Sequence, residues 1–170
     1  MQGVAAKAGE LAAVLPEDQR SAVVAAAWLH DIGYSPDLAR TGLHPLDGAA
    51  YLASLGDVDP VVIALVGYHT GALIKAGERG LAEQLRAYPA PPPQLLDVLT
   101  TADVLTGPDG APVTPEQRVT EILRRYPATD PVHRAVARSG PELVAMADRL
   151  LRLLSDVRAA SGGVERVADA

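Results

Sequence analysis

The sequence contains no cysteine, no phenylalanine and a single tryptophan among its 170 residues. Without cysteine, the chain has no disulfides, no thiolate metal ligands and no thiol nucleophile. Because aromatic side chains are so few, the core must consist mainly of alanine, leucine and valine, which favour closely packed helices over a β-sheet. We therefore expect an all-α protein built as a single helical bundle.

Long apolar runs and an excess of positive charge are also missing. No stretch reaches about 18 uninterrupted apolar residues, and no basic segment followed by an apolar run opens the chain, so we expect neither a membrane span nor a secretory signal. Fifteen Lys and Arg residues against 21 Asp and Glu residues give a formal net charge of −6. This charge argues against a nucleic-acid polymer as partner, but not against a small phosphorylated substrate, because bound cations would reverse the local charge. We expect a cytoplasmic protein.

The clearest regular pattern is helical periodicity, which glycine and proline interrupt. It predicts helices at Val4–Leu15, from Glu17 to about Gly33 with His30 and Asp31 in the last turn, and at Pro45–Leu55, Val61–Tyr68, Glu78–Tyr88, Leu95–Leu105 and Pro115–Tyr126. It also predicts a short helix from Pro131 and a long one from Pro141 to about Ala160. The second helix is apolar nearly all round, so we expect it to be the central buried one. We expect one domain over residues 1–160, with a core at about 1–106, C-terminal helices over 115–160 and a frayed tail at 161–170.

Three of the four histidines and one aspartate form a spaced pattern of metal-ligand type: His30-Asp31, His44, His69 and Asp103. Each lies at or near a predicted helix end or in a loop that a bundle can fold inward. Imidazole with carboxylate suits transition metals better than Mg or Ca alone. Because neighbouring helical residues point about 100° apart, two ions side by side could each take one residue of the His-Asp pair, or share its carboxylate.

Taken singly, these residues have plainer interpretations. His30 and Asp31 could simply end a helix, where a histidine interacts favourably with the dipole and an aspartate caps the turn. His44 could be an exposed loop residue, and His69 a hydrogen-bonded core histidine. Asp103 is costly to bury unless it is paired or liganded. The combination favours a metal centre.

The residues around these positions resemble the motifs of the HD-domain metal-dependent phosphohydrolases. The resemblance runs through Ala27–Tyr34, Leu43–Ala49 and Gly67–Gly71 to Asp103, in the family's order, and covers about residues 1–106. It implies an HD-domain-like helical fold and a metal-dependent phosphohydrolase that cleaves a nucleotide-like phosphoester or phosphoanhydride with a metal-activated hydroxide. Enzymes that split symmetric dinucleoside tetraphosphates carry a histidine-threonine signature similar to that of this chain.

The resemblance also implies the ligands. His30, Asp31 and Asp103 correspond to family ligands, with Asp31 as the catalytic residue that bridges two ions and orients the nucleophile. His44 and His69 match the additional histidines of the dinuclear branch. The cofactor implied is one or two divalent transition-metal ions, with Fe or Mn favoured and Co, Ni, Zn or Mg as alternatives.

One member of the family pattern is missing, because no histidine precedes His30, whereas the family's first ligand is a histidine on the opening helix. Two explanations stay open. A histidine lies directly before Met1 or within a few residues of it, beyond an incorrectly assigned start, or the protein has lost this ligand. The second explanation leads to an alternative function, a weakly active or inactive HD-fold module that binds metal or nucleotide for sensing or scaffolding. A purely structural helical protein would leave the polar cluster unexplained.

Weaker candidates surround the pattern. Lys75, Arg79, Arg40 and Thr41 are placed to hold a substrate phosphate, but each is equally well a solvated surface residue. Asp47, at a helix start, is interpreted as a dipole partner rather than a ligand.

The segment after residue 110 lies outside the resemblance. It could cover the pocket or form the surface of a homodimer. His133 lies in this segment, and we expect it at the surface.

Overall fold

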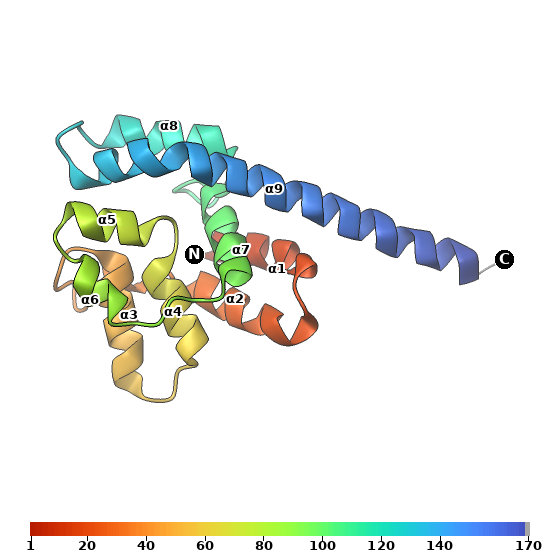
Figure 1. Ribbon diagram of the computed structural model, residues 1–170, viewed down its shortest axis with the longest axis horizontal. Helices are drawn as coiled ribbons and strands as arrows, with labels where there is room; N and C mark the ends of the chain where they lie inside the picture. Colours follow the sequence, from red (N-terminus) through yellow and green to blue (C-terminus); the bar gives the residue numbers. More distant parts are fainter. Residues whose placement is uncertain (169–170) are drawn as a thin grey trace.

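The computed structural model describes residues 1–168, with side chains described to residue 160, and this part of the chain is helical without strands (Figure 1). The fold class is therefore the one that the composition predicts. The elements are α1 (Gln2–Leu11), η1 (Ala12–Val14), α2 (Glu17–Leu29), η2 (Ile32–Tyr34), α3 (His44–Leu55), α4 (Pro60–Tyr68), α5 (Ala72–Glu78), α6 (Ala82–Arg86), α7 (Pro93–Val104), α8 (Pro115–Arg125) and α9 (Pro131–Ala168), η denoting a 3₁₀ turn.

Local capping explains several of the helix boundaries. The Asp59 side chain accepts a hydrogen bond from the Val61 amide at 2.8 Å and so begins α4. Thr114 and Gln117 form a complete capping box at the start of α8. Gly56 ends α3 at φ 82°, a left-handed conformation that suits glycine.

Small side chains bring α1, α2, α4 and α7 close together around the main core. Alanines such as Ala8, Ala26 and Ala102 are fully buried, beside leucines such as Leu65 and Leu99. The enclosed helices are α4 and α7, so the prediction that α2 is the central buried helix is wrong. Its alanine-rich surface is apolar all round but only one face is covered, and Trp28 is 47 % exposed.

The predicted helix Glu78–Tyr88 is also wrong. The chain forms α5 and α6 instead, with Gly80 at φ 71° between them. A left-handed residue cannot continue an α-helix, so the periodic pattern is broken there. The earlier helix α5 was missed because it begins directly after the left-handed Gly71, within an apparent loop.

Two C-terminal helices were predicted, but α9 is continuous through Pro141. A proline inside a helix removes one backbone hydrogen bond, and it normally bends or ends the helix. Close packing favours the continuous form here, since a Cβ on Gly140 would lie 2.9 Å from Val119 of α8. The predicted frayed tail, 161–170, lies outside the described side chains, and residues 169–170 lie outside the described backbone.

The helices α8 and α9 lie together across α5 and α7, and the C-terminal end of α9 projects beyond the other helices (Figure 1). Glu78 on α5 pairs with Arg134 at 2.8 Å and Arg138 at 3.0 Å, which ties α5 to α9. In the part of the chain that the structure describes, no single helix is long and apolar enough to cross a membrane. Together α4 and α5 reach that length and composition only as a pair bent by 56°, and residues of α4 such as Leu65 are buried in the core.

Candidate metal centre

Five side chains from four helix ends converge on one point of the bundle. His30 and Asp31 follow α2, His44 begins α3, His69 follows α4, and Asp103 lies in the last turn of α7. These are the five ligands that the resemblance implies. The structure therefore brings together residues that span more than seventy positions of the sequence.

The Asp31 carboxylate lies between two groups of ligand atoms. Its Oδ1 is 3.4 Å from His44 Nε2, and its Oδ2 is 3.2 Å from His30 Nε2. On the first side, His44 Nε2 and His69 Nε2 are 3.2 Å apart, and Asp31, His44 and His69 offer ligand atoms within 4.8 Å of one another. On the second side, His30 Nε2 is 3.9 Å from Asp103 Oδ1. This is the arrangement in which one carboxylate can serve two ions.

A tight contact between η2 and α3 fixes part of this geometry. A Cβ on Gly33 would lie 2.1 Å from the His44 carbonyl oxygen and 2.7 Å from the Gly48 amide nitrogen. Only glycine permits this approach. It holds Asp31, two residues before Gly33, against the first residue of α3.

Backbone hydrogen bonds orient two of the imidazoles. The Nδ1–H of His30 donates to the Ala27 carbonyl at 2.8 Å, and that of His69 donates to the Val66 carbonyl at 2.7 Å. In each ring this leaves the Nε2 lone pair directed at the other ligands.

Electrostatics keep Asp31, His44 and His69 in metal-binding form. Burial, with nearby positive charge, lowers the pKa of His44 to about 2 and that of His69 to about 4, so both rings are neutral at neutral pH. Burial also raises the pKa of Asp31, but the hydrogen bond to His30 and the surrounding imidazoles outweigh it and hold that pKa well below its usual range. Burial lowers the pKa of His30, yet the two neighbouring carboxylates outweigh it and raise that pKa.

Thr70 positions Asp103 in a way that the sequence reasoning missed. Thr70 is buried at φ 46°, a left-handed conformation that is rare for a β-branched residue. Its hydroxyl donates to Asp103 Oδ2 at 2.5 Å, and its amide donates to the Thr100 hydroxyl at 3.2 Å. The sequence feature that could have indicated this role is the threonine directly between His69 and Gly71.

The donor set fits divalent transition-metal ions. Three imidazoles and two carboxylates converge, and the fixed Nδ1–H of His69 means that its Nε2 faces His44 without a proton of its own. Such nitrogen and oxygen ligands match the preferences of Mn, Fe, Co, Ni and Zn. Asp31, His44 and His69 would hold one ion, and His30, Asp31 and Asp103 a second.

Three of the five candidate ligands, Asp31, His44 and Asp103, line a pocket of about 300 Å³. Lys75 of α5 lines it, whereas Arg79 does not and donates to the Gly42 carbonyl at 3.0 Å. The roof comes from α8 and α9, so the C-terminal segment covers the pocket. The lining residues from these helices are Arg118, Val119, Ile122, Arg125, Val132, Val136 and Leu143.

Arg40 and Thr41 lie in a different hollow, between α3 and α6. There the buried carboxylate of Asp47 accepts hydrogen bonds from both of their amides and from the Thr41 hydroxyl, at 2.8 to 3.2 Å. Asp47 therefore organises the loop before α3 and stands outside the group of converging ligands. The structure does not bring Arg40 or Thr41 to the pocket above the ligands.

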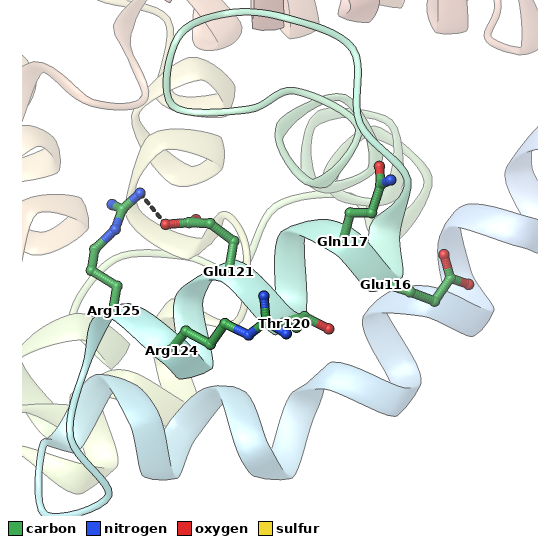
Figure 2. Close-up of a pocket in the computed structure, with 6 residues that line it drawn as sticks. All are labelled: Glu116, Gln117, Thr120, Glu121, Arg124 and Arg125. Atoms are coloured by element: carbon green, nitrogen blue, oxygen red, sulfur yellow. Dashed lines mark ion pairs between the residues drawn. The ribbon is translucent and has the colours of Figure 1, made fainter.

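Another face of α8 carries an open hollow of about 620 Å³ (Figure 2). None of the five candidate ligands lines it. Its residues are Glu116, Gln117, Thr120, Glu121, Arg124 and Arg125. Figure 2 shows the ion pair between Glu121 and Arg125 within this set.

His133 lies away from the ligands, but the expectation that it is a surface residue is wrong. It is half-buried, and its Nδ1–H donates to the carbonyls of Leu123 and Tyr126 at 3.1 and 2.9 Å. It thus satisfies carbonyl groups at the C-terminal end of α8.

Comparison with known proteins supports the resemblance. The family model described as "HD domain" matches residues 1–107, which is more than half of the chain and contains all five converging ligands. No curated protein and no solved structure gives a significant match. The chain belongs to the HD domain family.

Proposed function

We propose that this protein is a metal-dependent phosphohydrolase that cleaves a nucleotide-like phosphoester or phosphoanhydride with two divalent ions. The observation that carries the proposal is the Asp31 carboxylate, whose two oxygens face two separate groups of imidazole and carboxylate ligands at 3.2 and 3.4 Å. Membership of the HD domain family supports it. When bound, such ions supply an activated water nucleophile and neutralise charge on the phosphoryl oxygens.

The chain's own residues prepare the pocket for a phosphate. Lys75 is half-buried and, within the described residues, makes no hydrogen bond or ion pair, so its ammonium group is available to a substrate anion. Tyr34 stacks on the His44 ring with centroids 3.9 Å apart and holds that ring in place from the pocket side. The Thr70 hydroxyl holds the Asp103 carboxylate by donating a hydrogen bond to its Oδ2.

The experiment is phosphate release from a panel of nucleotides and simple phosphate esters, with the protein first stripped by chelator and then reloaded with Mn²⁺ or Fe²⁺. We expect hydrolysis only after reloading. Asp31→Asn should abolish it, whereas Asp148→Asn, the same change at an exposed position of α9, should retain it. Hydrolysis that persists without metal, or that survives in Asp31→Asn, would contradict the proposal.

A non-catalytic module that binds metal or nucleotide is the second candidate. It is favoured by the second ligand group, which contains one imidazole, His30, beside two carboxylates among the described residues. Stoichiometric metal binding without hydrolysis of any member of the panel would select this alternative.

A further inference from the structure

The side of the pocket that α8 and α9 form differs in chemistry from the side that the candidate ligands form. We propose that α8 and α9 make the pocket selective for a compact phosphate monoester carrying one apolar or aromatic group, with Arg118 binding the phosphate. The inference rests on the proposed metal-dependent hydrolysis at the same centre, and it replaces the nucleotide-like substrate by a smaller phosphate monoester. It concerns residues that the family match does not include, because that match ends at residue 107.

The apolar part of the roof is almost continuous. Val119 and Ile122 of α8 line the pocket together with Val132, Val136 and Leu143 of α9. No amide or carboxylate side chain of α8 or α9 lines it within the described residues. The aliphatic part of this wall selects a flat or aliphatic group by shape, whereas its hydrogen-bond donors, those of Arg118 and Arg125, are cationic and suit a phosphate.

The size of the pocket limits the substrate further. Its volume of about 300 Å³ lies at the lower end of the range of roughly 300 to 1,000 Å³ found for small-molecule sites. One ring system with a phosphate fits this space. A dinucleoside tetraphosphate, the substrate of enzymes with a similar histidine-threonine signature, would require room for a second nucleoside.

Arg118 supplies the cation on the roof. Its side chain is 17 % exposed, and its Nη1 donates to Glu121 at 2.6 Å, which fixes the guanidinium beside the pocket. A guanidinium has five N–H donors, so this pairing leaves others for a phosphate. Arg125 also pairs with Glu121 but is 44 % exposed, and its attraction for a phosphate is therefore more strongly screened.

Lys75 approaches the same space from α5. Burial lowers the pKa of Lys75, the site carboxylates oppose this, and the nearby charge of Arg118 adds to the lowering. Two cations thus stand near each other in the pocket. A phosphate between them would relieve their repulsion, and a dianionic monoester would do so more fully than a monoanionic diester.

The test uses phenylphosphonate, a non-hydrolysable analogue of an aromatic phosphate monoester, bound to the metal-loaded full chain and measured by calorimetry. Arg118→Ala should weaken binding about ten- to a hundredfold, the effect of losing a hydrogen bond to a charged group. Arg124→Ala should leave binding unchanged, because Arg124 lines the separate hollow on the other face of α8 (Figure 2).

A second pair of variants tests the apolar wall independently of Arg118. Ile122→Trp should fill the pocket, so that phenylphosphonate binds at least tenfold more weakly while the smaller methylphosphonate still binds. Thr120→Trp places the same side chain on the exposed face of α8 and should change neither. Circular dichroism checks that each variant remains folded.

The outcomes separate this inference from the function on which it depends. Phenylphosphonate binding that is unchanged in Arg118→Ala, or a parent enzyme that hydrolyses diadenosine tetraphosphate faster than phenyl phosphate, would overturn the substrate class while leaving a metal-dependent hydrolase in place. Metal binding without any phosphonate binding would overturn it in the same way. A protein that binds no metal would overturn both.

Discussion

The strained residue Thr70 offers a sharp test of how the site is built. A non-glycine residue in the left-handed region costs about 1–3 kcal/mol, and Thr70 lies there at φ 46°. The conformation is retained because its hydroxyl donates to Asp103 Oδ2 at 2.5 Å. A hydrogen bond to a charged group contributes about 1.5–3 kcal/mol, which is of the same size as the strain.

Three substitutions separate the two contributions. Thr70→Ala keeps most of the strain and loses the bond to Asp103, whose side chain is only 14 % exposed, so we expect a loss of about 2 kcal/mol from the free energy of unfolding. Thr70→Ser keeps the hydroxyl and should stay within about 1 kcal/mol of the parent. Thr70→Gly loses the bond but relieves the strain, and should lie between them.

The assay is urea denaturation of the metal-free protein followed by circular dichroism, with an unchanged slope against urea as evidence that the folded state is intact. Calorimetric titration with Mn²⁺ gives the second readout. Because Thr70 supports a ligand, Thr70→Ala and Thr70→Gly should both weaken metal binding about 10- to 100-fold. Thr70→Ala as stable as the parent, or Thr70→Ser as damaging as Thr70→Ala, would refute the reasoning.

Two further predictions concern the imidazoles and the contact at Gly33. In the metal-free protein, the free energy of unfolding should fall as the pH drops from about 6.5 towards 4. The pKa of His69 is lowered to about 4 by burial, so the unfolded chain takes up a proton that the folded state excludes. This contributes a slope of about 1.4 kcal/mol per pH unit. His44, whose pKa burial lowers to about 2, adds a slope of the same sign, whereas the raised pKa of His30 changes stability only above about pH 6.5. Urea denaturation at several pH values measures it, and stability that rises on acidification would contradict it. Gly33→Ala should destabilise the fold by about 3 kcal/mol or more, because its Cβ would meet backbone atoms at 2.1 and 2.7 Å, whereas Gly9→Ala, with nothing within 4 Å, should be neutral or stabilising in the same denaturation experiment.

Much of the site could be predicted from the sequence because its residues mark helix ends. The pattern His30-Asp31, His44, His69 and Asp103 is readable since each member interrupts or ends an apolar periodic stretch. The structure brings all five together. That these residues bind metal, and that they bind two ions, is proposed.

Other features depend on contacts between distant segments, which local patterns do not contain. The continuity of α9 through Pro141 depends on packing against α8, and the division into α5 and α6 depends on the backbone conformation at Gly80. From the sequence, the C-terminal segment could either cover the pocket or form a homodimer surface. The structure places residues of this segment over the pocket. No periodicity could show that Arg118 lies above a centre whose ligands end at Asp103.

The central claim is that Asp31 joins two groups of metal ligands, and metal content tests it most directly. The parent, Asp31→Ala and Asp148→Ala should be loaded with Mn²⁺, freed of excess metal and analysed by mass spectrometry for metal per chain. Asp148 is the matched control because it is an exposed carboxylate on α9. We predict at least one ion per chain in the parent and in Asp148→Ala, and none in Asp31→Ala with helicity unchanged. Equal metal in Asp31→Ala and the parent would show that the centre does not depend on Asp31.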